Sequence, residues 1–267
     1  MSQSKLAHRA LSGSIHKGIK MKTVSHTLVA LAASLGLAQS AHAVDIAVDQ
    51  DVMTSVFFTG TDLVRGYAED ANRPVMRVSN HNTNGMTGAE TIYLTFDYDF
   101  STFTGPVVAT LTMQSAEGGF GGDAGPGNPF TVSAHGVDLD PLASITDDTN
   151  PGGTVSWLNF YNNNILAADT AAYTSIDGYG TVTFDVSALV NSWVDGSNAI
   201  HAIAFTGKND TSGNQFLHGF LNNDNGGTAM GYTFLTVTAV PEPEAYAMLL
   251  AGLGMTGWMV RRRKHLG

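Results

Sequence analysis

Short runs rich in β-branched and aromatic residues recur along the middle of this 267-residue chain. Clusters of Gly, Asn, Asp and Pro, the residues that turns require, separate one run from the next. The runs are Val52–Phe58, Val75–Val78, Thr91–Tyr98, Val107–Met113, Thr131–His135, Thr154–Phe160, Thr181–Val186, Ala199–Phe205, Phe216–Leu221 and Tyr232–Thr238. So many short strands joined by turn-rich loops predict an all-β fold, an antiparallel β-sandwich or jelly roll.

One short helix is predicted within this β region, at Ser187–Trp193. At helical spacing Leu189, Val190 and Trp193 share one face, and Ser187 can cap the first turn. The helix is therefore expected to pack its apolar face on the sheet.

The N-terminal end has the pattern of an export signal. A positively charged start is followed by an apolar segment and then by Ala41-x-Ala43, the small-residue pattern at which signal peptidase cuts. We expect cleavage after Ala43 and assign residues 1–43 to a signal peptide, with Met21 as an alternative start of the protein.

The C-terminal end has three parts in a fixed order: a Pro-Glu-Pro motif, an apolar stretch at 245–260 and a run of arginines. The motif and the arginine run comprise Pro241, Glu242, Pro243, Arg261, Arg262 and Arg263. The stretch is almost as long as the roughly 17–25 residues of a spanning helix, and a basic run favours the cytoplasmic side. These features predict a C-terminal helix that spans the inner membrane.

This tail, residues 240–267, resembles the PEP-CTERM sorting signals of Gram-negative bacteria. The resemblance implies recognition by an exosortase, a membrane protease that cuts near Pro-Glu-Pro and releases the protein outward. It also implies an organism that makes exopolysaccharide. The expected partners are signal peptidase and the exosortase during export, and extracellular polysaccharide afterwards. An ordinary C-terminal membrane anchor is the alternative.

The segment between the two ends, 44–239, is strongly acidic. Val44–Val240 carries four basic residues against twenty-one acidic ones, a net charge of −17. Because phosphate groups would repel such a domain, nucleic acid is not expected as a partner. The chain also contains no cysteine, which excludes disulfide bonds and thiol catalysis.

Two passages of this domain resemble the DNRLRE-type β-sandwich domains. The first is YLTFD at Tyr93–Asp97 with the strand that follows it, and the second is TVTFDVSALVNSW at Thr181–Trp193. The resemblance implies a carbohydrate-binding-module-like jelly roll, of a kind found in surface and polysaccharide-associated proteins. From the residues alone, Phe96 and Phe184 are expected in the core, and the aspartates that follow them, Asp97 and Asp185, are expected to face outward or to cap a turn.

Two kinds of ligand site are suggested by residue type. Trp157, Tyr161 and Asn163 combine aromatic rings with amides, as sugar binding requires, although a solvated Asn-rich loop is the alternative reading. Three aspartates at the start of the domain offer the carboxylates that Ca²⁺ prefers. These candidate ligands for a structural calcium are Asp45, Asp49 and Asp51.

Catalysis would need a different arrangement. Glycoside hydrolysis requires two carboxylates at a fixed separation, and the closely spaced pairs are Asp97 with Asp99, Asp138 with Asp140, and Asp147 with Asp148. The chain has no G-x-S-x-G nucleophile elbow. We therefore predict an exported, non-enzymatic component or binder of the exopolysaccharide matrix, with a secreted polysaccharide hydrolase as the alternative.

Overall fold

A computed structural model describes most of the chain between the two end segments, together with the C-terminal helix. The described residues are 42–55, 63–65, 75–79, 90–118, 124–127, 129–146, 152–166, 172–207, 217–221, 232–241 and 243–264. Ser40–Glu242 forms one compact unit, and Pro243–Gly267 belongs to a second. The predicted signal peptide lies outside the described residues except for its last positions.

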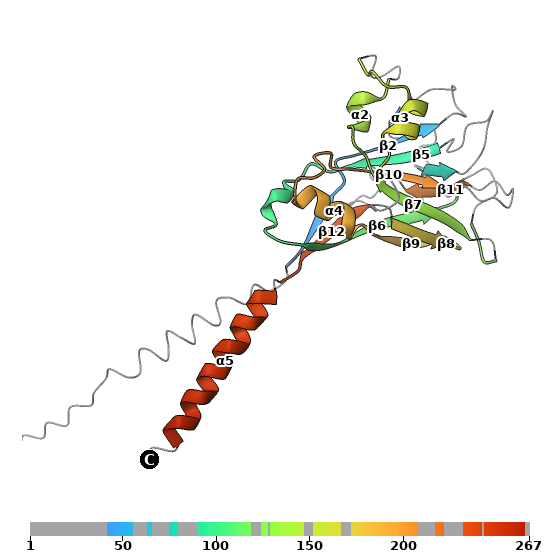
Figure 1. The fold of residues 1–267 in the computed structure, drawn as a ribbon. Helices are drawn as coiled ribbons and strands as arrows, with labels where there is room; N and C mark the ends of the chain where they lie inside the picture. The colour runs from blue at the N-terminus through green and yellow to red at the C-terminus, as the bar shows by residue number, and fades with distance from the viewer. Residues whose placement is uncertain are drawn as a thin grey trace, which may run out of the picture. The chain divides into compact units, whose positions relative to one another are not determined.

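The described strands of the first unit join in one antiparallel sheet (Figure 1). They are β1 (Ala43–Ala47), β2 (Gln50–Ser55), β3 (Leu63–Arg65), β4 (Val75–Ser79), β5 (Glu90–Thr95), β6 (Val107–Ala116), β7 (Phe130–Gly136), β8 (Ala172–Ile176), β9 (Gly180–Asp185), β10 (Ala202–Gly207), β11 (Leu217–Leu221) and β12 (Phe234–Ala239). The main path runs β1-β12-β6-β11-β4-β5-β10-β7-β8, with β9 beside β6 and β2 joining β5 to β3.

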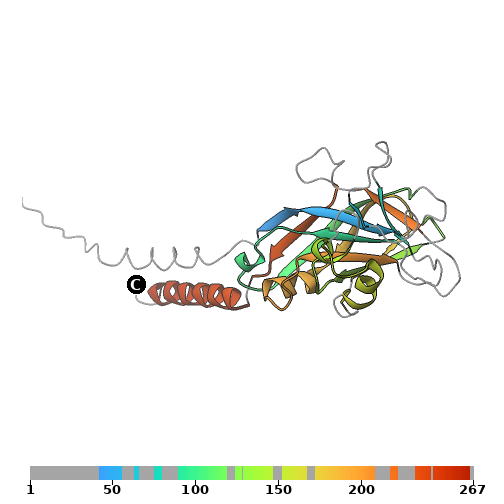
Figure 2. The ribbon, with the colours of Figure 1, turned by 90° about the horizontal axis from the view of Figure 1, so that it is seen from above.

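The sheet curls where its strands are joined by few residue pairs. β11 meets β6 at two pairs and β4 meets β5 at one, Ser79 with Glu90, whereas β12 and β6 pair along six residues. The curl brings strands that are not neighbours face to face, since the rings of Phe184 in β9 and Phe205 in β10 lie 5.2 Å apart. Figure 2 gives the view from above. The predicted all-β antiparallel class is confirmed, but the described strands form one curled sheet, and the predicted sandwich of two sheets is not confirmed among them.

The inside of the curl holds the main hydrophobic core. Its largest fully buried side chains come from strands on both sides, among them Met53, Met76, Ile92, Leu94, Leu111, Phe130, Phe184, Phe205 and Phe220. Burial of this apolar surface is the principal source of the unit's stability. Phe96 and Phe184 lie in this core and Asp97 and Asp185 are exposed, as the sequence predicted.

Helix α4 (Ser187–Val194) closes one end of the core and confirms the predicted helix. Its residues Leu189, Val190 and Trp193 are buried, with the Trp193 ring 4.9 Å from that of Phe100 in the 3₁₀ turn η1 (Phe100–Thr102). The prediction that Ser187 caps the helix is wrong. Val186 holds the cap position, because the Ser187 hydroxyl is turned toward β6, where it accepts a hydrogen bond from the backbone N–H of Ala109 (2.9 Å).

Two short helices cover part of the outer face of the sheet (Figure 1). They are α2 (Pro141–Ser144) and α3 (Trp157–Asn163), joined by an isolated bridge between Ile145 and Val155. Their apolar side chains form a second buried cluster with β2, β5 and β10, comprising Val52, Tyr93, Val137, Leu142, Ile145, Trp157, Phe160, Ala202 and Ala204.

The predicted strand at Thr154–Phe160 is wrong, because its second half forms α3. The Ser156 hydroxyl accepts a hydrogen bond from the Asn159 backbone N–H and caps the helix. Trp157 and Phe160, three residues apart, then point to the same buried side. Every other predicted run overlaps a strand, whereas β1, β3, β8 and α2 were not predicted.

The second unit contains helix α5 (Pro243–Lys264), which includes both the apolar stretch and the basic run. Among the residues that the structure describes, no helix is long and apolar enough to cross a membrane. The predicted spanning helix is therefore not confirmed, since the stretch is short and Gly252, Gly254 and Gly257 dilute its apolar residues.

Candidate functional site

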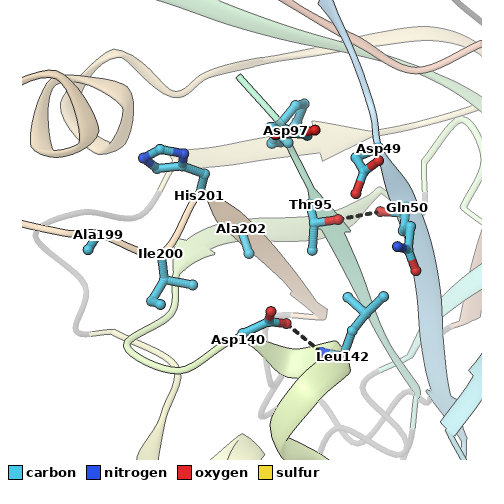
Figure 3. Close-up of a pocket in the computed structure, with 11 residues that line it drawn as sticks. Asp49, Gln50, Thr95, Asp97, Asp140, Leu142, Ala199, Ile200, His201 and Ala202 are labelled. Carbon is cyan, nitrogen blue, oxygen red and sulfur yellow. Dashed lines mark hydrogen bonds between the residues drawn. The ribbon is translucent and has the colours of Figure 1, made fainter. Parts of the chain in front are cut away.

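A pocket of about 310 Å³ opens at one end of the sheet, where β2 begins, β5 ends and β10 begins (Figure 3). The strand register brings these ends together, because Thr95 of β5 pairs with Gln50 on one side and with Ala202 on the other. The lining residues are Asp49, Gln50, Thr95, Phe96, Asp97, Asp140, Leu142, Ala199, Ile200, His201 and Ala202. Residues from four distant parts of the sequence therefore meet at one hollow.

Three exposed carboxylates surround the pocket. In Figure 3, Asp49 and Asp97 lie on one side of the hollow, and Asp140 lies across from them. Asp140 caps helix α2, because its Oδ1 accepts hydrogen bonds from the backbone N–H groups of Leu142 (2.8 Å) and Ala143 (3.2 Å). The carboxylates of Asp49 and Asp97 make no hydrogen bond or ion pair within the described part of the chain, so both can bind a ligand.

His201 precedes β10 and forms another side of the pocket. Its imidazole packs edge-on against Phe100 (4.8 Å) and lies near Trp193 (5.6 Å). Partial burial lowers the pKa of His201, and the nearby carboxylate of Asp99 opposes this effect. The ring is therefore neutral at pH 7 and can both donate and accept a hydrogen bond.

The remaining lining has polar and apolar groups. Thr95 donates a hydrogen bond from its hydroxyl to the backbone oxygen of Gln50 (3.4 Å), and Gln50 itself also lines the pocket. Leu142, Ile200 and Ala202 supply apolar surface. A few polar groups beside an apolar wall are typical of small-ligand sites, whose volumes start at about 300 Å³.

The residues predicted to bind sugar lie outside this pocket. Trp157 is only 4% exposed and packs in the second cluster, and Tyr161 is half-buried, with burial raising the pKa of its hydroxyl. Asn163 is exposed, and its side-chain amide donates to the backbone oxygen of Asn159 within α3 (2.9 Å). Trp157 is therefore not an exposed stacking platform, because α3 turns it toward the sheet.

The three predicted calcium ligands are separated. Asp45 in β1 accepts a hydrogen bond from the Thr236 hydroxyl of β12 (2.6 Å), Asp49 lines the pocket, and Asp51 is buried. The strand structure breaks between β1, which pairs with β12, and β2, which pairs with β3 and β5, so the three carboxylates are carried to different parts of the sheet. No group of three or more His, Asp or Glu side chains among the described residues is placed to hold a metal ion, so the calcium prediction gains no ligand set.

The predicted carboxylate pairs that were considered for hydrolysis are also separated in the structure. Asp97 and Asp140 both reach the pocket, although they come from different predicted pairs. Asp99 accepts hydrogen bonds from Ser101, and Asp138 accepts one from the Asn164 side chain. Asp147 and Asp148 lie outside the described residues.

The contribution of Gln50, Thr95 and Ile200 to a site was not predicted. Their only signal in the sequence is position, since each lies at the end of a strand or just before one. Which strand ends meet depends on strand order, and that order is not visible in the sequence.

Of the residues predicted for sorting, the Pro-Glu-Pro motif lies at the boundary between the two units, and the arginine run lies at the end of α5. Pro241 is partly exposed, Glu242 lies outside the described residues, and Pro243 begins α5. Arg261 and Arg262 are exposed, and Arg263 is in the same helix. The guanidinium carbon of Arg262 lies 4.8 Å from the centre of the Trp258 ring, a cation–π contact.

The predicted signal-peptide cleavage site is only partly described. Ala41 lies outside the described residues, and Ala43 is the first residue of β1, where it is exposed. Cleavage after Ala43 stays a prediction.

Comparison with known families bears directly on the C-terminal tail. Residues 239–264 match the PEP-CTERM protein-sorting motif, and no curated protein matches the chain. This match confirms the resemblance drawn from Pro241–Pro243 and the arginine run. The resemblance of the central domain to DNRLRE-type domains gains no support. The motif indicates an exported, surface-directed protein that is anchored transiently in the membrane and then processed by an exosortase.

Proposed function

We propose that this protein acts outside the cell as a non-enzymatic binder of the extracellular polysaccharide matrix, after an exosortase has removed its tail. The single observation that carries the export half of the proposal is the PEP-CTERM motif at 239–264. The binding half rests on the pocket formed by the ends of β2, β5 and β10. Its amide, hydroxyl and imidazole groups suit a ligand with many hydroxyls, and its apolar wall suits the C–H face of a sugar ring.

The charge of the domain supports the same class of partner. Polysaccharides that are neutral or positively charged would not be repelled by a net charge of −17 between Val44 and Val240. Polyanions, by contrast, would be.

This binding is tested with the full chain and the exopolysaccharide of the producing bacterium. The polymer should co-sediment the wild-type protein and should retain at least tenfold less of an Asp97→Asn variant. Asp177→Asn, an exposed aspartate that does not line the pocket, should behave as wild type. Equal retention of all three proteins would contradict the proposed site, and no retention of any would contradict matrix binding.

A polysaccharide hydrolase is the second candidate, and a specific observation favours it. Asp49, Asp97 and Asp140 surround one pocket together with His201, and glycosidases use paired carboxylates across a cleft. Release of reducing sugar ends from the exopolysaccharide, lost in Asp97→Asn, would establish the hydrolase in place of the binder.

A further inference from the structure

The charged side chains among the described residues of the pocket beside Asp97 are all negative. Among the described residues, its lining includes three carboxylates and no lysine or arginine, and the imidazole of His201 is neutral at pH 7 because burial lowers its pKa. An anionic sugar such as a uronic acid would therefore meet only repulsion at this site. Sulfated and phosphorylated sugars are disfavoured for the same reason.

The carboxylates of the pocket differ in the hydrogen bonds that they already accept from the protein. Asp140 is held by two backbone N–H groups at the start of α2. Asp49 and Asp97 accept no hydrogen bond from any described residue and face the hollow from the same side (Figure 3). A ligand that brings a positive charge to this side would form charge-assisted hydrogen bonds, which are about twice as strong as neutral ones.

A metal ion is not the positively charged ligand that this pocket suits. The described residues contain no group of three or more acidic or histidine side chains that could hold one. Hard cations take six to eight oxygen ligands from protein and water, whereas a primary ammonium group needs only three acceptors. The carboxylates of Asp49 and Asp97 and the side-chain amide oxygen of Gln50 can supply the three acceptors that an ammonium group needs.

The rest of the pocket indicates what carries the ammonium group. Thr95, Gln50 and His201 offer hydrogen bonds to hydroxyls, and Leu142 and Ile200 offer apolar contact. A volume of about 310 Å³ is at the small end of ligand sites. It suits one ring of a sugar chain, while the exposed rim leaves room for the neighbouring rings.

We propose that this pocket binds an amino-sugar unit whose amine is free, with the ammonium group between Asp49 and Asp97 and the ring hydroxyls toward Gln50, Thr95 and His201. The inference rests on the proposed function and deepens it, because it names the class of polysaccharide: one in which hexosamine units have lost their N-acetyl groups.

The test is a set of calorimetric titrations of the full chain in detergent micelles at pH 6. The probes are a glucosamine hexamer, an N-acetylglucosamine hexamer, a glucose hexamer and hexalysine as a charge-matched peptide. The glucosamine hexamer should bind at least tenfold more tightly than each of the other three. Asp49→Asn and Asp97→Asn should each weaken it at least tenfold, and Asp177→Asn should leave it unchanged.

Several results would overturn the inference. Equal binding of the acetylated or the glucose hexamer would exclude a requirement for the free amine and would leave the proposed function standing. Equal binding of hexalysine, or equal weakening by Asp177→Asn, would mean that overall acidity attracts the probe. Failure of every hexamer together with the native exopolysaccharide would remove both proposals. Circular dichroism of each variant shows that a loss of binding is not a loss of fold.

Discussion

At the scale of single residues, Asn191 completes the backbone pairing of a strand. β9 pairs with β6 between Thr110 and Ser115, and beyond that point the chain turns into α4. The Asn191 side chain then donates to the backbone oxygen of Val107 and accepts from its N–H, both at 2.8 Å. A side chain thus replaces a strand, and the end of β6 keeps its hydrogen bonds.

Replacing Asn191 by alanine should therefore destabilise the first unit by about 2–4 kcal/mol, because two partly buried backbone groups lose their partners. Chemical denaturation measures this change. Asn159→Ala serves as the control, since that residue is also helical but exposed, and it should cost less than about 0.5 kcal/mol. Equal stabilities of the two variants would contradict the assigned role.

Three aspartates close turns by binding the serine two residues ahead. Asp99, Asp185 and Asp195 each accept a hydrogen bond from the backbone N–H of that serine, and in the first two the serine hydroxyl donates as well, at 2.6 Å. These side-chain and backbone hydrogen bonds lower the pKa of all three carboxyl groups. The turns that begin η1 and α4 therefore depend on ionised carboxylates.

The direction of the pKa shifts sets the pH dependence. A carboxyl with a lower pKa in the folded state adds stability above its unfolded pKa of about 3.9, and this stability is lost as the pH falls through the folded value. The free energy of unfolding of Asp185→Asn should therefore fall less between pH 5 and pH 2 than that of the wild type. Parallel pH profiles in denaturant titrations would show that this carboxylate contributes nothing.

At the scale of elements, α3 shows where prediction from sequence fails. Aromatic and β-branched residues at Thr154–Phe160 favour a strand by propensity. The competing signals are local, namely the Ser156 cap and the three-residue spacing of Trp157 and Phe160. Tertiary packing decides the outcome, because only the helix turns both rings onto the outer face of β2, β5 and β10.

The strands with alternating apolar residues were predictable because one side of each faces the core. β6 shows this alternation over its whole length, from buried Val107 to half-buried Ala116. β8 buries only Ile176 and β3 has only three residues, so neither carries the pattern. The pocket was not predictable, since it depends on the register that aligns Gln50, Thr95 and Ala202.

If packing in the second cluster holds α3 on the sheet, removal of the most buried ring of α3 should free the helix from the sheet. Phe160 is fully buried and packs edge-on against Tyr93, with ring centres 5.4 Å apart. Phe160→Ala should cost about 3–5 kcal/mol. Asn162→Ala, on the exposed side of the same helix, should change the unfolding free energy little, and a similarly small effect of Phe160→Ala would contradict the packing assigned to α3.

At the scale of the whole molecule, the two predicted processing sites lie next to neighbouring strands. β1 and β12 pair in antiparallel register, so that Ala43 lies opposite Thr238. The predicted signal-peptidase site at Ala43 and the sorting motif that starts at Pro241 therefore lie near the same end of one strand pair. Cleavage after Ala43 and near Pro241 would remove only the Ala43–Thr238 pair from these two strands and none of the residues that line the pocket.

The most direct test of export and processing is intact mass spectrometry of the protein recovered from the inner membrane, the cell surface and the medium of the producing bacterium. We expect an external form that begins at Val44, ends close to Pro241–Pro243 and lacks Arg261–Arg263. A protein that keeps its arginine run and remains in the inner membrane would contradict this expectation, because the tail would then be an anchor that no exosortase removes.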